Sequence, residues 1–366
     1  MTSTPRQRFL DYVRHVPGAR PVVSPFLPNA DVIAACLRTL GLPATEDTIE
    51  NEVHLAEALD YEPMFMVDCM GQIMRWQKDP AHSDERWDGW FIDTPKGPWR
   101  CRTSHALGAW GDDSGFAVQT EADHEMLALV CAQVSQHEAE IRQYYRDWRQ
   151  RAGENGVIVI GHPHITSLAY QIGQQNLVYH YSDYLDAYRR SEEALYEASL
   201  YVFNIAMQEG IDFMSESTYA LEMVSPRFID AEDIPYLARL ADWTHTHDGL
   251  FWYHNCGMTR WMFVTGRMSR IHADVIETVA PPPEGDNDLA ESRRALDPAT
   301  CSKGNLSLRT LRDGTVDQVV AETRALVHAA QGYAHILSTA DAVLPNTPPE
   351  NLIAFVRTAR EESAKL

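Results

Sequence analysis

The residues best suited to chemistry lie in the run 251–257, where an imidazole and a thiol stand two positions apart, at His254 and Cys256. Residues i and i+2 of a β-strand face the same side, so these two side chains can converge on one point. A neutral imidazole and a thiolate are ligands that Zn²⁺ prefers. The pair supplies only two ligands, however, and buried cysteine is common in protein cores, so spacing alone also allows a packing role.

Short apolar segments alternate with helical stretches along the whole chain and would have to position this pair. The predicted strands are Arg20–Phe26, Pro63–Asp68, Gly156–Gly161, Ile211–Glu216, Gly249–His254, Ala273–Glu277, Ala299–Gly304 and Tyr333–Ser338. Strands that alternate with helices form a parallel sheet, and eight of them close naturally into a (β/α)₈ TIM barrel. We therefore predict one barrel domain over residues 1–366. A doubly wound open sheet is less favoured, because no glycine-rich phosphate loop follows any strand.

The predicted barrel also contains several helices and one inserted segment. The longest helical pattern covers Asp123–Arg151, and two more cover Asp183–Glu209 and Asp230–His247. Ser225 before Pro226 is a typical helix start. The segment Trp87–Gln119 is rich in Gly, Pro, Trp and Thr, which predicts a β-hairpin inserted before the third strand of the barrel.

Catalytic groups of such barrels gather at the carboxyl ends of the strands, where this chain places several polar residues. These residues are Asp68, His162, Glu216, His254, Cys256, Glu277, Asn305 and Asp341. Our metal hypothesis is a zinc ion on His254 and Cys256, with oxygen from Glu277 and a further ligand from Asp341 or, in reserve, from Cys301. Asp68, Glu216 and His162 are the predicted catalytic residues, although Asp68 and Glu216 could equally be helix caps or surface acids.

Composition excludes several classes of protein. The chain has 366 residues and a formal net charge of −21, without a basic stripe, which argues against nucleic-acid binding. No apolar run reaches membrane-spanning length, and residues 1–8 lack a signal-peptide core. The six cysteines are spread without framework spacing, as in reduced cytoplasmic proteins. We expect a soluble cytoplasmic enzyme.

Several short motifs, in order and spacing, resemble the uroporphyrinogen decarboxylase superfamily, and most closely its branch of methylcobalamin:coenzyme M methyltransferases. The motifs are Thr94-Pro95-Lys96-Gly97, Ser225-Pro226-Arg227-Phe228, Pro235-Tyr236, His254-Asn255-Cys256-Gly257, Lys303-Gly304-Asn305-Leu306, Gly314-Thr315 and the closing run 345–352. The resemblance covers most of the chain and is strongest from about Gly161 onward. It implies a (β/α)₈ barrel, in agreement with the strand pattern.

The resemblance also implies a chemistry. Methyltransferases of this branch hold zinc with a His-x-Cys pair and a later Cys, and move a methyl group between a small substrate and a corrinoid. His254 and Cys256 match the first two ligands, but Ala340-Asp341-Ala342 stands where the later Cys is expected. Asp341 would be a harder oxygen donor, which favours a methylated ether, amine or thioether over coenzyme M. Asn305, in its motif, is the expected cofactor-binding residue.

The implied partner is a separate corrinoid protein, because the Asp-x-His-x-x-Gly signature of a cobalamin-binding module is absent from the sequence. Analogy with the superfamily would also allow a homodimer, which nothing in the sequence shows. The decarboxylase branch fits less well, since the first strand lacks the arginines that would grip several carboxylates.

Two other functions stay open at this stage. One is a metal-free decarboxylase or lyase that uses Asp68 or Glu216 as its acid–base group. The other is a non-catalytic barrel that binds a corrinoid or maturation protein.

Overall fold

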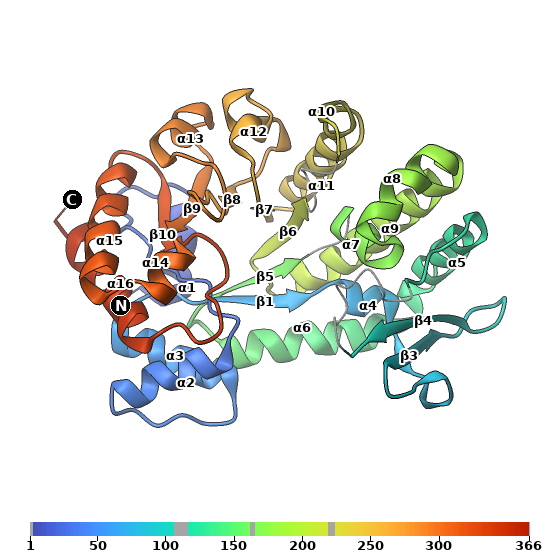
Figure 1. Cartoon of the computed structure of the whole chain (residues 1–366), viewed down its shortest axis with the longest axis horizontal. Coiled ribbons are helices and arrows are strands. Elements are labelled where there is room, and N and C mark those ends of the chain that lie inside the picture. Colours follow the sequence, from blue (N-terminus) through green and yellow to red (C-terminus); the bar gives the residue numbers. More distant parts are fainter. Residues whose placement is uncertain (1–2, 106–115, 162–164, 219–223, 366) are drawn as a thin grey trace.

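Seven parallel strands form a curled sheet surrounded by helices in the computed structural model, which describes residues 3–105, 116–161, 165–218 and 224–365 (Figure 1). Neighbouring strands follow one another in the order β1-β5-β6-β7-β8-β9-β10. Their bounds are β1 Met64–Asp68, β5 Val157–Gly161, β6 Phe213–Thr218, β7 Leu250–Asn255, β8 Val275–Glu277, β9 Cys301–Leu306 and β10 His335–Thr339. Both ends of each strand lie within two residues of the corresponding ends of a predicted strand.

The remaining predicted strand, Arg20–Phe26, closes the sheet with a single β-bridge, between Val23 and Leu337 of β10. Ser24 N donates to the Leu337 carbonyl over 2.9 Å, and on the other side Glu62 N donates to the Val23 carbonyl over 2.9 Å. The segment therefore joins β10 to the start of β1. Pro25, which has no N–H group, ends this pairing. The prediction of a TIM-barrel-like fold is confirmed, with its first strand reduced to one bridge.

Most helices cover the outside of the sheet, whereas α1 closes the amino-terminal end of the barrel. The longer ones are α1 Pro5–Val13, α2 Ala30–Thr39, α3 Thr48–Leu59, α5 Glu121–Cys131, α6 Glu138–Ala152, α7 Ile165–Ile172, α8 Gln174–Asp183, α9 Leu185–Gln208, α11 Ile234–Thr246, α15 Val316–Ala330 and α16 Pro349–Ser363. The shorter ones are α4 Met70–Met74, α10 Pro226–Phe228, α12 Arg260–Val264, α13 Leu289–Ala295 and α14 Leu308–Asp313. As predicted, Ser225 caps α10, accepting from Phe228 N over 3.2 Å.

One helix prediction is wrong in extent. The pattern over 123–151 is broken into α5 and α6 by a 3₁₀ turn at Val134–His137. Both helices pack on α9, but α5 also packs on α4, whereas α6 also packs on α3 and β5. Because these partners differ, the chain must turn between α5 and α6.

The hairpin predicted within Trp87–Gln119 is present over residues 87–104, and residues 106–115 of the predicted segment lie outside the described residues. Strands β3 (Trp87–Ile92) and β4 (Trp99–Ser104) pair in antiparallel fashion, and β2 (Gln77–Lys78) adds to the edge of β3. Its turn is held by Thr94, whose Oγ1 donates to the Gly97 carbonyl over 2.6 Å, with Gly97 at φ +103°. This small sheet stands outside the barrel, beside α4 and α5 (Figure 1).

The barrel interior is apolar at the amino ends of its strands and polar above. The apolar layer is plugged by α1, and its members are Phe9, Leu10, Val13, Val22, Met64, Val157, Val159, Phe213, Leu250, Trp252, Val275, Cys301 and Ile336. Side chains alternate along each strand, so the residues two positions further along point into the barrel above this layer. A second, larger core lies between the strands and the helices.

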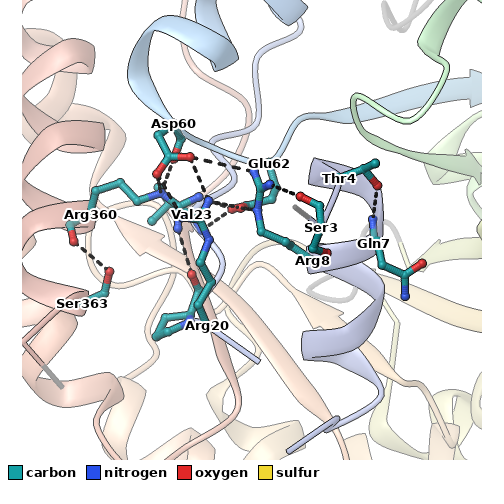
Figure 2. A network of polar contacts seen from close by, with 11 residues as sticks. Ser3, Thr4, Gln7, Arg8, Arg20, Val23, Asp60, Glu62, Arg360 and Ser363 are labelled. Atoms are coloured by element: carbon teal, nitrogen blue, oxygen red, sulfur yellow. Dashed lines mark hydrogen bonds and ion pairs between the residues drawn. The ribbon is translucent and has the colours of Figure 1, made fainter. Parts of the chain in front are cut away.

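Polar contacts tie the ends of the chain together at the amino-terminal face of the barrel (Figure 2). The fully buried Glu62 carboxylate accepts from Arg8 Nε at 2.8 Å, from Arg20 Nη2 at 2.9 Å and from Arg360 of α16. Its second oxygen also accepts from Val23 N over 3.2 Å. We call these four charged residues the Glu62 cluster.

Candidate active site

Strand β7 aims His254 into the barrel. Phe251 and Tyr253 belong to the outer core, whereas Trp252 belongs to the inner layer, so His254 follows Trp252 on the inner face. Cys256 comes next and its thiol is hydrogen-bonded to the His254 ring. The expected convergence of this imidazole and thiol is therefore present.

The turn after β7 is fixed by Asn255, whose side chain points the other way. Asn255 Nδ2 donates to Thr259 Oγ1 over 2.8 Å, and its backbone carbonyl accepts from Thr278 Oγ1 over 2.5 Å. Gly257 then adopts φ +90°, a conformation that favours glycine. Together these contacts hold Cys256 at the carboxyl end of the strand.

His254, Glu277 and Lys303 stand side by side because they are register partners on three adjacent strands, β7, β8 and β9. Glu277 Oε2 lies 3.3 Å from His254 Nδ1 and accepts from Trp252 Nε1 over 3.1 Å. Glu277 Oε1 lies 2.5 Å from Lys303 Nζ. Both carboxylate oxygens are thus engaged, which places Glu277 behind His254 as its support.

The charges in this group reinforce each other. Burial alone would raise the pKa of Glu277, but the Lys303 ammonium and the His254 ring lower that pKa to about 2. Burial opposes a charge on His254, yet hydrogen bonds to Cys256 and Glu277 and the charge of Asp341 raise its pKa well above the usual value. The site therefore attracts positive charge at His254, as a cation-binding position would.

Asp341 follows β10 and is within electrostatic reach of His254. Its Oδ1 accepts from Ala342 N over 2.6 Å, and its backbone carbonyl accepts from Thr339 Oγ1 over 2.7 Å. Within the described part of the chain, no three His, Cys, Asp or Glu side chains are grouped closely enough to hold a metal ion. The structure thus assembles two zinc-type donors, and Asp341 would have to turn from Ala342 to become the third.

The other expected site residues are dispersed. Asp68, at the end of β1, is exposed; its carboxylate accepts from Gly71 N over 2.9 Å, and partial desolvation raises its pKa. Asn305 donates to the Val279 carbonyl over 3.0 Å. His162 lies outside the described residues.

Two expected residues point elsewhere. Glu216 is fully buried, and because Phe213 belongs to the inner layer and Met214 to the outer core, Glu216 lies on the outer face of β6. Cys301 lies at the start of β9 in the inner apolar layer, at the opposite end of the strands from Cys256, where burial raises its pKa to about 12. Neither side chain is brought to the pair.

Comparison with known proteins assigns the chain to a family. The profile of the uroporphyrinogen decarboxylase (URO-D) family matches residues 164–362, more than half of the chain. The chain belongs to this family. The match includes the His254–Cys256 turn, Glu277, Lys303 and Asp341. No curated protein sequence matches the chain.

One solved structure shares the fold of this chain, and a second shows a weaker similarity. A methyltransferase from Methanosarcina mazei superposes with a TM-score of 0.66 at 16% identity, over 98% of this chain and 99% of that chain. A B12-independent methionine synthase from Shewanella sp. W3-18-1 gives a TM-score of 0.46 at 10% identity, over 88% of this chain and 92% of that chain. No helix in the described segments is both long and apolar enough to span a membrane.

Sequence reasoning missed Lys303 as a site residue in this URO-D family member. Lys303 is fully buried in the middle of β9 and supplies the only ion-pair partner besides His254 that the structure describes for Glu277. The signal was available, since a lysine inside a strand between Cys301 and Leu306 must find an anion when it is buried. All six cysteines are free, as expected from their spacing.

Proposed function

We propose that this chain is a methyltransferase that binds zinc through His254 and Cys256, with Asp341 as the third ligand, and exchanges a methyl group between a small methylated substrate and a corrinoid on a partner protein. Membership of the URO-D family supports an enzyme of this class. One observation carries the metal site: Glu277 engages His254 Nδ1, so that Nε2 remains to bind a metal beside the Cys256 thiol.

The donor set suits the metal. Zinc-bound histidines commonly give their second nitrogen to a carboxylate, which fixes the ring orientation, and Glu277 stands in that position. Three protein ligands would leave a fourth position open to substrate. When bound, zinc supplies either a deprotonated thiol acceptor or Lewis-acid polarisation of the heteroatom that leaves the methyl group.

The protein's own residues prepare this site. The buried Glu277–Lys303 pair keeps the carboxylate ionised, so that it holds the His254 ring at Nδ1. The apolar layer beneath, including Trp252 and Val275, closes the barrel floor and keeps water out from below. The corrinoid would approach from the open end, where Cys256 lies.

Zinc content tests the proposal directly. We expect about one zinc per chain in the wild type and none in His254→Ala/Cys256→Ala, with loss or weakening in Asp341→Ala. Cys301→Ala is the matched control, because it removes a thiol that lies far from the pair, and it should keep its zinc. Zinc retained by the double variant, or absent from folded wild type, would refute the metal site. Free cob(I)alamin and methylcobalamin, followed by their absorbance spectra, then test methyl transfer.

A second function is favoured by one observation at Asp68. Its carboxyl group stands exposed at the carboxyl end of β1 with a raised pKa, as a general acid requires. This is the metal-free decarboxylase or lyase. A zinc-free preparation that releases CO₂ from a carboxylated substrate, and loses that activity in Asp68→Asn, would establish it in place of methyl transfer.

A further inference from the structure

A cavity of about 250 Å³ lies between the segment 26–30 and β1. It is bounded by α2, α3, β1 and the Trp148 side chain of α6. Most of the residues that line it are apolar, among them Phe26, Ile33, Met64, Met66 and Trp148, although polar atoms contribute nearly half of its surface. The space corresponds to about eight water molecules, which is enough for a small organic molecule.

The cavity lies beside β1, where the pairing of β1 with the first segment of the barrel ends. The segment 22–24 pairs with β10 and contacts the start of β1 through Glu62 N; Phe26 then stays beside the end of β10, and its carbonyl accepts from Val343 N over 2.9 Å. The hydrogen-bonded partner of β1 beyond this point is β5 on its other side. The edge of β1 that a full first strand would cover therefore faces the cavity.

One ionisable side chain, that of Glu52 in α3, lines this cavity. Glu52 is 6% exposed, and its Oε1 has no hydrogen-bond partner in the described structure. Tyr61 Oη reaches only the Glu52 backbone carbonyl, at 3.4 Å, and no described Lys, Arg or His pairs with the carboxyl group. The adjacent Asn51, also buried, is by contrast satisfied at both ends by the backbone of Thr45.

A buried polar atom without a partner is rare and costly, so Glu52 needs an explanation. Packing does not supply one, because a leucine would fill the same position without the penalty of an unpaired carboxyl group. A ligand bound in the cavity would supply one. The ligand must offer a hydrogen-bond donor to Oε1 and an apolar body to the surrounding walls.

We propose that this cavity is a binding site for a small protonated amine with an apolar body, and that Glu52 accepts the N–H of the ammonium group. The Trp148 and Phe26 rings would lie against the charged group and its substituents, as aromatic rings do in cation-binding sites. An anion is disfavoured, because no Lys, Arg or His side chain is among the residues that line the cavity. The inference goes beyond the proposed methyl transfer and does not depend on it.

Binding would move one proton. Burial raises the pKa of the Glu52 carboxyl group well above its usual value and so favours the neutral acid when no ligand is bound. An ammonium ion entering the cavity favours the carboxylate, and the carboxyl proton leaves to solvent. Cys36 and Tyr61, the other titratable groups of this region, stay neutral because burial raises both of their pKa values. One amine bound should therefore release about one proton.

The cavity also borders the candidate site. The Phe26 ring centroid lies 5.6 Å from Lys303 Nζ, which pairs with Glu277. Phe26 therefore forms a wall between the cavity and the polar layer of the barrel. His254 and Cys256 are not among the residues that line the cavity.

Isothermal titration of the zinc-loaded or metal-free full chain with N,N-dimethylbutylamine tests the proposal. We expect binding with release of about one proton, measured from the dependence of the heat on buffer ionisation. The N,N,N-trimethylbutylammonium ion keeps the charge but has no N–H, and should bind at least ten-fold more weakly. 1-Butanol carries no charge and should release no proton.

Two variants and a control complete the test. Glu52→Gln should lose at least ten-fold in amine affinity and all proton release, whereas Glu57→Gln, on the exposed face of the same helix, should match the wild type. Ala30→Trp, at the exposed rim, should block the cavity while leaving Glu52 in place. Wild type that binds no amine, or equal amine affinity in Glu52→Gln or in Ala30→Trp, would overturn the proposal.

Discussion

Lys303 Nζ and Glu277 Oε1 lie 2.5 Å apart in the barrel interior, and neither side chain is more than 1% exposed. Such a pair gains little over an apolar pair, because both charges are removed from water. The contribution of this ion pair is to hold side chains in position. It fixes the carboxylate whose other oxygen holds His254, and so links three neighbouring strands to the orientation of one imidazole.

We predict that Lys303→Met destabilises the protein strongly. The substitution leaves Glu277 buried without its cation, which costs about 3–5 kcal/mol of unfolding free energy. Urea denaturation followed by circular dichroism measures the loss. The double variant Lys303→Met/Glu277→Met should recover part of it, because both charges are then gone. An unchanged midpoint in Lys303→Met would mean that the pair is not formed in solution.

We also predict that Glu277→Gln weakens zinc binding about 10–100-fold in the folded protein, because the amide supports His254 less firmly than a carboxylate. The variant should also be less stable, because Lys303 loses its buried anion. Competition with a zinc-chelating dye measures the affinity. Glu291→Gln, which breaks a surface pair with Arg260, is the control and should bind zinc normally. Equal affinities in the two variants would show that Glu277 does not support a metal ligand.

Much of this arrangement could be predicted from sequence. Apolar segments bounded by turn residues gave the position of all strands of the barrel, and the His-x-Cys spacing at the end of one strand identified two residues that do meet. Their meeting needs only the two-residue period of a strand. The hairpin was equally local, since Pro95 and Gly97 mark its turn.

The rest depended on long-range packing. Phe213–Thr218 is short and mostly apolar at its start, so its sequence does not reveal which alternate residues face inward, and Glu216 falls on the outer face. The union of Glu277 with Lys303 depends on the register between β8 and β9, which no local pattern encodes. The break between α5 and α6 likewise reflects the different elements on which the two helices pack.

The Glu62 cluster leads to a prediction about the closure of the barrel. Glu62→Gln should cost about 3–5 kcal/mol, because it removes the buried charge shared by Arg8, Arg20 and Arg360 (Figure 2). Asp60→Asn is a matched control that touches the same arginines, but the Asp60 side chain is 60% exposed, so its loss should cost no more than about 1 kcal/mol.

Urea denaturation of the two variants separates the alternatives. Similar, small losses would mean that the cluster behaves as an ordinary surface network and does not close the barrel. A large loss in Glu62→Gln alone would show that the amino-terminal helix, the first strand and α16 are held by one buried carboxylate.

Two buried histidines join α5, α8 and α9, and they should make the folded protein less stable in acid. His124 Nε2 lies 3.0 Å from His180 Nδ1, and His124 Nδ1 lies 2.9 Å from Ser191 Oγ. Ser191 Oγ donates to the Tyr188 carbonyl over 2.8 Å, so it accepts from His124 Nδ1–H, and His124 Nε2 accepts from His180 Nδ1–H. This chain of bonds requires a neutral His124.

Burial and the neighbouring His180 lower the pKa of His124 to about 4, below its value of about 6.5 in the unfolded chain. Because the unfolded chain takes up this proton more readily, the stability that the neutral His124 contributes to the folded protein is fully present above about pH 6.5. That contribution is lost as the pH falls from about 6.5 to about 4. The loss should reach no more than about 3 kcal/mol. Denaturation midpoints at pH 7.5, 6 and 5 measure it. His124→Gln should flatten this pH dependence, because the amide cannot take up a proton; a variant as acid-sensitive as the wild type would assign the loss to other groups.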